Sequence, residues 1–311
     1  MGVAVAFLFP GQGSQAVGMG RDLCARFPVA RQVFAEADDV LGYAISRLCF
    51  EGPLDELTLT ANTQPALLTA SRALARVLAT EFRLSPSWAA GHSLGEFSAL
   101  VAAGALTFAD ALRVVRERGR AMQTAVAPGV GSMAAVLGLD LATLTAICQE
   151  AADGQVVSPA NVNGGGQIVI AGHREAVERA AALAQQNGAK RIVPMAVSAP
   201  FHCALMAPAA ERLRQVLSPV SVSPLHCPVI SNVDARACTD AGRVKDLLVR
   251  QVVSPVRWQE CVEELAHLGC RTAIEVGPGR VLRSLVRRIA PDIRCVAGED
   301  LESVRTLLEA A

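Results

Sequence analysis

The sequence predicts an α/β protein with a parallel sheet and a smaller inserted domain, and three observations support this prediction. Residues 3–9 form a continuous apolar run of β-branched and aromatic side chains, which suits a central parallel strand covered on both faces. Residues 87–103 read as a short strand, a sharp turn and a helix. Residues 132–197 read as strand, helix, strand, strand, helix and strand, which is the order of the ferredoxin-like arrangement.

The first part of the chain predicts one strand followed by helices. The strand at 3–9 ends in a polar, glycine-rich loop at 10–15, and ligands bind at this end of the strands in open α/β sheets. The helix expected at 64–82 begins with Thr63 and Pro65, which suit a cap and a first turn. The expected helices cover residues 20–25, 28–41, 64–82, 96–103 and 108–125, with a strand at 87–90.

The pattern changes after a Pro-Gly pair at residues 128 and 129. The expected strands cover residues 132–139, 156–162, 167–171 and 190–197, and the helices cover 141–152 and 174–187. We therefore expect a ferredoxin-like small domain at 129–197, inserted into a large domain formed by 1–128 and 198–311. The large domain resumes with helices at 208–217, 244–251, 258–268 and up to 289, and with strands at 229–232 and 272–276.

The charge balance argues against nucleic-acid binding. Lys and Arg together number 29, as do Asp and Glu, so the formal net charge of the 311 residues is zero. Binding to nucleic acid depends on many contacts between basic side chains and phosphates, which this balance does not favour. With 51% hydrophobic and only 19% charged residues, the composition is that of a well-packed globular protein.

The cysteines and the N-terminus indicate a cytoplasmic location. The nine cysteines are scattered and form no Cys-x-x-Cys pair, so we expect free buried thiols in a reducing compartment and no metal site. The apolar N-terminus lacks a basic segment and runs directly into Pro10, unlike a signal peptide. No apolar run approaches the roughly 20 residues of a membrane-spanning helix, so no membrane association is expected.

Residues 91–95 read Gly-His-Ser-Leu-Gly, which matches the Gly-x-Ser-x-Gly pattern of a nucleophile elbow. The two glycines allow a backbone bend too tight for a Cβ, so that the hydroxyl of Ser93 stands clear of the chain. A helix that starts there directs free N–H groups at any anion formed. The pattern makes Ser93 a candidate nucleophile and the large domain α/β-hydrolase-like. The alternative is a chance match in an alanine-rich turn.

A serine hydroxyl needs a base within hydrogen-bond reach, and the chain has five histidines. His92 lies beside the serine, where its side chain is expected to point away from the hydroxyl and to pack or hydrogen-bond locally. His202 lies in a strand-end loop just after the small domain, which makes it the candidate base. The alternative is a structural histidine whose hydrogen bonds are satisfied.

Several motifs occur in order along the chain. They are Phe-Pro-Gly-Gln-Gly-Ser-Gln at 9–15, Gly-His-Ser-Leu-Gly-Glu at 91–96, Arg-Gly at 118–119, Asn-Val-Asn at 161–163, Pro-Phe-His at 200–202 and Gln-x-x-x-Pro-Val at 251–256. Together they resemble the malonyl-CoA:acyl carrier protein transacylases of bacterial fatty-acid synthesis and the related acyltransferases of polyketide synthases. The resemblance covers essentially the whole chain. One departure is the Gly-Gly-Gly at 164–166, where a Ser-x-Gly-like sequence would be expected.

The resemblance implies a role for each matching residue. Ser93 attacks the thioester of malonyl-CoA, and His202 takes the serine proton and later returns it to the leaving thiol. The backbone carbonyl of Gln251 orients the imidazole in place of the usual acidic residue. The oxyanion hole comprises the backbone N–H groups of Leu94 and Gln12.

Arg118 is implied to bind the free carboxylate of the malonyl group, because an arginine fork pairs with a carboxylate bidentately. The alternative is an ordinary basic helix face shared with Arg113, Arg116 and Arg120. Phe201 is implied to favour malonyl over methylmalonyl, since a large ring would crowd an α-methyl group. Asn163 is implied to line the site between the domains, with a turn residue as the alternative.

The resemblance implies an [acyl-carrier-protein] S-malonyltransferase that works through a malonyl-serine intermediate with ping-pong kinetics. Its expected partners are malonyl-CoA and acyl carrier protein, with no metal or redox cofactor, and the protein is expected to be a monomer. Two alternatives use the same chemistry: a stand-alone polyketide synthase acyltransferase and the malonyl-transfer subunit of a malonate decarboxylase. A serine hydrolase is less favoured, because no Asp or Glu stands out as a partner for His202.

Overall fold

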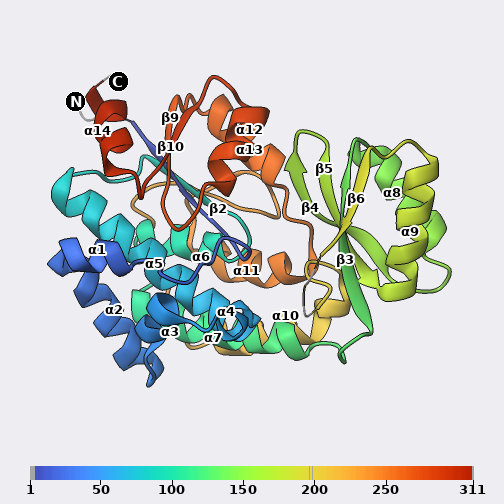
Figure 1. Cartoon of the computed structure of the whole chain (residues 1–311), viewed down its shortest axis with the longest axis horizontal. Coiled ribbons are helices and arrows are strands. Elements are labelled where there is room, and N and C mark those ends of the chain that lie inside the picture. Colours follow the sequence, from blue (N-terminus) through green and yellow to red (C-terminus); the bar gives the residue numbers. More distant parts are fainter. Residues whose placement is uncertain (1–3, 196, 198, 310–311) are drawn as a thin grey trace.

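The computed structural model describes residues 4–195, 197 and 199–309. Two sheets organise the chain, a six-stranded one in the larger part and a four-stranded antiparallel one in the smaller part (Figure 1). The domain boundary expected at residue 198, and residue 196 of the last strand expected in the small domain, lie outside the described residues.

The six-stranded sheet has the strand order β10-β9-β1-β2-β7-β8. All neighbouring pairs run parallel except β7 and β8. The strands are β1 (Ala6–Phe9), β2 (Trp88–Gly91), β7 (Val229–Ile230), β8 (Ala237–Cys238), β9 (Thr272–Glu275) and β10 (Arg294–Ala297). The predicted parallel sheet is therefore present, with one antiparallel strand at its edge.

The central strand β1 is buried on both faces, as its continuous apolar sequence predicts. Phe7 and Phe9 point into the core formed with helices between residues 28 and 124. Ala6 and Leu8 point to the opposite face, where they pack in one cluster with Trp258. Because successive side chains of a strand alternate between faces, helices on both sides explain why every position is apolar.

Helices cover both faces of this sheet (Figure 1). They are α1 (Arg21–Arg26), α2 (Pro28–Leu41), α3 (Ile45–Glu51), α4 (Leu54–Thr58), α5 (Thr60–Glu81), α6 (Gly95–Ala102), α7 (Phe108–Thr124), α10 (Ala207–Leu217), α11 (Val244–Val253), α12 (Trp258–His267), α13 (Val281–Ile289) and α14 (Leu301–Glu309), with short 3₁₀ turns at η1 (Ala204–Met206) and η2 (Ala241–Arg243).

The smaller part follows the predicted order of strands and helices. It consists of β3 (Gly131–Leu137), α8 (Leu141–Ala151), β4 (Val157–Gly164), β5 (Gln167–His173), α9 (Arg174–Gln186) and β6 (Arg191–Pro194), with the sheet order β4-β5-β3-β6. Ala134 and Val136 of β3 pack into a separate core with α8 and α9. Met133 and Ala135, on the opposite face, join the core of the larger part. One face of the small sheet thus rests against the larger part.

Backbone hydrogen bonds join the two parts beside the loop at 163–166. Val162 N–H donates to the carbonyl of Val256 at 2.9 Å, and Val256 N–H donates to the carbonyl of Ala160 at 2.9 Å. These bonds attach β4 to the segment that leads into α12. The position of the small sheet relative to the larger part is therefore set by backbone contacts as well as by packing.

Several elements differ from the sequence-based expectation. Helix α5 begins at Thr60, so Thr63 is not its cap and Pro65 lies inside it. A proline inside a helix removes only the one N–H bond to the carbonyl four residues earlier, and burial of the helix outweighs that loss here. The short elements α3, α4, β8, β10 and α14 were not expected, because brief amphipathic segments carry little periodicity.

Candidate active site

Ser93 lies at the turn between β2 and α6, with a backbone φ of 51° in the left-handed region. The flanking glycines are required by space. A Cβ on Gly91 would lie 1.9 Å from the carbonyl carbon of Gly95, and a Cβ on Gly95 would lie 2.0 Å from the carbonyl oxygen of Phe9. The turn is thus packed so closely against β1 that only glycine fits on either side of the serine.

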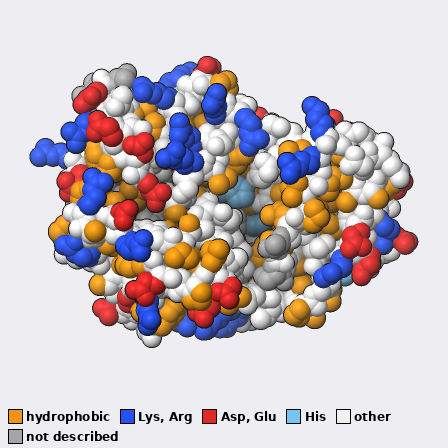
Figure 2. All heavy atoms as spheres, in the orientation of Figure 1, with side chains coloured by type: hydrophobic (Ala, Val, Ile, Leu, Met, Phe, Trp, Pro, Cys, Tyr) orange, Lys and Arg blue, Asp and Glu red, His pale blue; other side chains and the backbone are white. Residues whose placement is uncertain are grey.

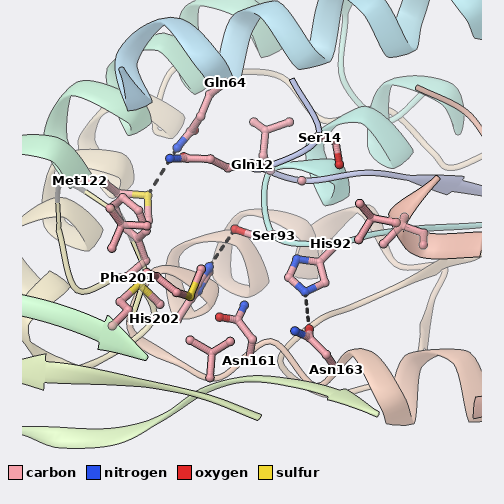
Figure 3. A pocket seen from close by; sticks show the side chains of 18 of the residues that line it. Gln12, Ser14, Gln64, His92, Ser93, Met122, Asn161, Asn163, Phe201 and His202 are labelled. Carbon is pink, nitrogen blue, oxygen red and sulfur yellow. Dashed lines mark hydrogen bonds between the residues drawn. The ribbon is translucent and has the colours of Figure 1, made fainter. Parts of the chain in front are cut away.

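The hydroxyl of Ser93 faces the imidazole of His202 (Figure 3). Ser93 Oγ lies 2.8 Å from His202 Nε2, and His202 Nδ1 lies 2.8 Å from the backbone carbonyl oxygen of Gln251. Because a carbonyl only accepts, Nδ1 carries the proton and Nε2 is left free to accept from the serine. The backbone of Gln251 therefore sets the tautomer that a general base requires.

The imidazole of His202 is held neutral. Its side chain is buried, and burial together with the nearby Arg118 charge lowers the pKa of His202 from 6.5 to about 3. Among the residues that the structure describes, no carboxylate accepts a hydrogen bond from this histidine. The acidic partner that would favour a hydrolase is absent from this part of the chain.

Arg118 of α7 is 1% exposed and points at the nucleophile. Its Nη2 donates to Ser93 Oγ at 3.2 Å and to Gln251 Oε1 at 2.8 Å, and its Nη1 donates to Gln64 Oε1 at 2.9 Å. Nε is buried and has no hydrogen-bond partner among the described residues. Burial lowers the pKa of Arg118 to about 10, so the group stays charged at neutral pH. The alternative of an exposed basic face does not hold for this residue.

The side chain of Gln251 connects the arginine to a buried carboxylate. Gln251 Nε2 donates to Glu96 Oε2 at 2.7 Å and to the backbone carbonyl of Ser93 at 3.0 Å, while Oε1 accepts from Arg118. Glu96, in the first turn of α6, is 3% exposed, and burial raises its pKa to about 7. Gln251 thus orients the base through its backbone and the arginine through its side chain.

Asn232 holds the elbow from the end of β7. Its Oδ1 accepts from Ser93 N–H at 2.8 Å, and its Nδ2 donates to the carbonyl of Gly91 at 2.7 Å. Its own N–H donates to Glu96 Oε2 at 3.1 Å. Sequence reasoning placed Asn232 only as the last residue of a strand. Its position at the carboxyl end of a parallel strand beside the elbow was a signal that could have found it.

The Ser93–His202 dyad opens into a cavity of about 170 Å³ between the two parts of the molecule. Gln12 lines the side of the first loop, and Phe201 and Asn163 line the opposite side (Figure 3). Leu94 of the elbow also lines the cavity. In the space-filling view, histidine side chains are visible at the bottom of a hollow between the two parts (Figure 2). The structure therefore brings the candidate residues to one cavity, except Gln251, which contacts His202 and Arg118 without lining it.

Asn163 contacts the residue next to the nucleophile. Its Oδ1 lies 2.9 Å from His92 Nε2, a pair that joins β4 to the elbow (Figure 3). His92 points away from Ser93 Oγ, as expected. Its hydrogen bond joins the elbow to the small sheet. The ring of His92 also lies against Trp258, with centroids 5.6 Å apart.

Gln64 of α5 was not singled out from the sequence. Its Oε1 accepts from Arg118, and its Nε2 lies 3.7 Å from the sulfur of Met122 (Figure 3). Because Gln64 lies far from the other motifs along the chain, no sequence pattern pointed to it.

Among the described residues, no cluster of three or more His, Cys, Asp or Glu side chains could hold a metal ion. Within the same residues, no helix combines the length and apolarity needed to cross a bilayer.

Known proteins resemble this chain over nearly its whole length. The model of the acyl transferase domain family matches residues 6–296. The malonyl CoA-acyl carrier protein transacylase of Escherichia coli K12 is 50% identical over 304 residues, which cover 98% of both chains. The crystal structure of an acyl carrier protein S-malonyltransferase from Vibrio cholerae is 48% identical, with a TM-score of 0.94 over 97% of this chain and 100% of its own.

One similar structure contains a partner. It is a malonyl-transacylase in complex with its type II PKS acyl-carrier protein, and it is 48% identical with a TM-score of 0.96, covering 99% of this chain and 100% of its own. The matches extend over nearly the whole length of each relative. The chain therefore belongs to the acyl transferase family, in the branch that includes the malonyl CoA-acyl carrier protein transacylases.

Proposed function

We propose that this protein transfers the malonyl group from malonyl-CoA to the phosphopantetheine thiol of an acyl carrier protein through a malonyl-Ser93 intermediate. The observation that carries the proposal is the position of Arg118, whose guanidinium lies 3.2 Å from the nucleophilic hydroxyl. A malonyl group has one methylene between its thioester carbonyl and its carboxylate. A buried cation immediately beside the serine matches that short spacing.

The first half-reaction forms the acyl-enzyme. Ser93 Oγ attacks the thioester carbonyl as its proton moves to His202 Nε2, and the backbone N–H groups of Leu94 and Gln12 stabilise the oxyanion. The C–S bond then breaks, and the His202 proton passes to the departing CoA thiolate. A thiolate leaves more readily than an amine, so a backbone carbonyl at Gln251 suffices to orient the base.

The second half-reaction runs the same steps in reverse with a different thiol. His202 takes the proton of the carrier thiol, whose sulfur attacks the malonyl ester of Ser93, and the proton returns to Ser93 Oγ as the ester bond breaks. Arg118 holds the malonyl carboxylate through both halves, and no group outside the chain and its two substrates is needed to balance either one.

We infer that Asn163 and Phe201 shape the acyl pocket from the side of the small sheet. Phe201 is 8% exposed and lines the cavity, where an α-methyl substituent would meet its ring. Phe201→Ser is expected to raise the rate of methylmalonyl transfer relative to malonyl transfer. Equal ratios of methylmalonyl to malonyl transfer in the variant and the wild type would show that Phe201 does not select the acyl group.

We infer two domains, an α/β-hydrolase-like one at 1–128 and 198–311 and a ferredoxin-like one at 129–197. The separate core of the small sheet and its βαββαβ order support this division. Limited proteolysis that leaves one resistant fragment of about these bounds would support it, and cleavage throughout 129–197 would count against it. We further propose a cytoplasmic monomer, which light scattering after size exclusion and cell fractionation can check.

Initial rates with varied malonyl-CoA and carrier protein test the proposed reaction. A ping-pong enzyme gives parallel lines in double-reciprocal plots, and Ser93→Ala should give no transfer. Rates with carriers of fatty-acid and polyketide synthesis, and with the carrier subunit of a malonate decarboxylase, identify the pathway. Release of free malonate at a rate that no carrier changes would indicate a serine hydrolase and contradict the proposal.

A further inference from the structure

Three of the five N–H bonds of Arg118 have acceptors before substrate arrives. A guanidinium has five N–H bonds: one on Nε and two on each Nη. Both hydrogens of Nη2 have acceptors, Ser93 Oγ at 3.2 Å and Gln251 Oε1 at 2.8 Å, while Nη1 donates to Gln64 Oε1. The Nε–H has no acceptor among the described residues, and Nη1 has one acceptor there for its two hydrogens. Any ligand that binds the guanidinium bidentately must displace one of the two contacts of Nη2.

A carboxylate can bind a guanidinium bidentately along the edge formed by the two Nη atoms or along the edge formed by Nε and Nη2. Both edges include one hydrogen of Nη2. The Nε edge also supplies a partner for the buried Nε–H, which otherwise has none. A carboxylate that binds in either way takes a hydrogen that now goes to Ser93 or to Gln251.

The contact with Ser93 is the one that yields. The bond from Arg118 to Gln251 is shorter, at 2.8 Å against 3.2 Å. The amide of Gln251 also cannot turn, because its Nε2 donates to Glu96 Oε2 and to the backbone carbonyl of Ser93. A flipped amide would set its oxygen against both of these acceptors. The fixed amide therefore keeps its hydrogen, and the serine loses its own.

We propose that the carboxylate of the acyl substrate activates the nucleophile: by pairing with Arg118 it releases Ser93 Oγ and cancels the positive charge beside His202. This inference rests on the proposed malonyl transfer and adds to it a second function of the carboxylate. The substrate class it selects is acyl thioesters whose acyl group carries a free carboxylate. Selection then occurs in the chemical step as well as in binding.

Both consequences favour acylation. A hydrogen donated by a cation lowers the nucleophilicity of the hydroxyl oxygen that receives it. The Arg118 charge also lowers the pKa of His202, so it opposes the imidazolium that forms when the serine proton arrives. The charge would favour a serine alkoxide, but the attack leaves an uncharged serine oxygen in the new C–O bond and an imidazolium at His202. Neutralising Arg118 therefore lowers the barrier.

A small serine reagent without a carboxylate separates activation from substrate recognition. Methanesulfonyl fluoride reacts with the Ser93 hydroxyl to form an S–O bond; the S–F bond breaks, fluoride leaves and the proton goes to His202. Formate serves as the probe for the carboxylate site. We expect formate to accelerate sulfonylation of the wild type by about tenfold relative to chloride at equal ionic strength, from the loss of one buried charge contact.

Two variants accompany the wild type. Arg118→Met removes the donor and the charge at similar volume, so its sulfonylation should be faster than that of the wild type and indifferent to formate. Arg113→Met changes an exposed arginine of the same helix and should respond to formate as the wild type does. The comparison of formate with chloride in the wild type needs no substitution, so a folding defect in Arg118→Met leaves the test intact.

The outcomes are distinct. A wild-type rate that formate leaves unchanged, or slows by occupying the cavity, overturns the activation while malonyl transfer stands. No sulfonylation of Ser93 under any condition overturns the dyad, and with it both the activation and the proposed function. Acceleration that appears equally in Arg118→Met overturns the activation as well, because the effect would then not pass through the arginine.

Discussion

The backbone N–H of Ser93 donates to the side-chain Oδ1 of Asn232 at 2.8 Å, although the two residues are 139 positions apart. The side-chain amide of Asn232 also donates, from Nδ2, to the carbonyl of Gly91 at 2.7 Å. Asn232 thereby fixes the turn from both sides. A non-glycine residue in the left-handed region costs about 1–3 kcal/mol, and surrounding contacts must hold it there. At Ser93, Asn232 supplies those contacts.

Asn232→Ala should destabilise the protein and misplace the nucleophile. Two buried backbone groups lose their partners, which costs about 2–4 kcal/mol in the free energy of unfolding. Denaturant titration measures the loss, and rapid-quench acylation measures the effect on Ser93. Asn232→Asp is the matched control, because it keeps an acceptor for Ser93 N–H and places an oxygen against the Gly91 carbonyl. It should acylate faster than the alanine variant, and equal rates would contradict this role.

Gly95→Ala should prevent folding of the elbow. The new Cβ would lie 2.0 Å from the carbonyl oxygen of Phe9 and 3.1 Å from that of Pro10, and both are backbone atoms that cannot move aside. We expect insoluble protein or a loss of more than about 4 kcal/mol. Gly242→Ala is the control, since its nearest contact is the side chain of Asp240 at 3.1 Å. A stable, active Gly95→Ala would contradict the packing described here.

The buried Glu96 should make stability fall as pH rises. Its pKa is 4.5 in the unfolded chain and about 7 in the folded protein, because burial disfavours the charged form. Between these values the folded state binds the extra proton, so the free energy of unfolding decreases with rising pH. At 1.36 kcal/mol per pKa unit the change is on the order of 3 kcal/mol. Burial of neutral His202 acts in the opposite direction between pH 6.5 and about 3.

Glu96→Gln separates the two contributions. The stability of the wild type minus that of the variant should decrease steadily between pH 4.5 and 7, since only the wild type carries the carboxyl. Chemical denaturation at several pH values gives this difference directly. A difference that is constant across the range would mean that Glu96 titrates normally in the folded protein.

Arg118→Ala should abolish malonyl transfer and spare or improve the transfer of acyl groups without a carboxylate. An unpaired buried carboxylate costs about 3–5 kcal/mol, so the malonyl rate should fall by roughly 10²–10⁴-fold. Acetyl-CoA and malonyl-CoA are compared by kcat/KM. Arg113→Ala, on an exposed position of the same helix, should change neither rate. Malonyl transfer that survives in Arg118→Ala would show that another group binds the carboxylate.

The sequence predicted the order of the main elements well, because long periodic segments carry strong patterns. Helix α2 was predicted with its observed ends, Pro28 and Leu41, and the helix after the elbow within one residue. The errors fall on short or buried segments. Helix α5 begins four residues earlier than expected, since its interior proline was read as a first-turn residue. Strand β7 has two residues where four were expected.

The candidate site was predicted as residues but not as a network. Ser93 and His202 follow from an elbow and a strand-end histidine, and Arg118 from its match to a family motif. The contacts of Asn232 and Glu96 form only when distant segments meet, so the sequence places Asn232 at a strand end but does not give its partners. Arg118 illustrates the limit, because a helix with four arginines does not reveal which one is buried.

A single-turnover experiment with isotopically labelled malonyl-CoA tests directly whether the malonyl group passes through Ser93 to the carrier thiol. The enzyme is mixed with the labelled substrate, quenched, and mapped by peptide mass spectrometry before and after addition of a phosphopantetheinylated carrier protein. If malonyl-Ser93 is the intermediate, one malonyl group is found on Ser93, and it disappears on addition of the carrier as an equal amount appears on the carrier thiol. Label on another residue, or loss of the malonyl group to water at a rate that the carrier does not change, would contradict it.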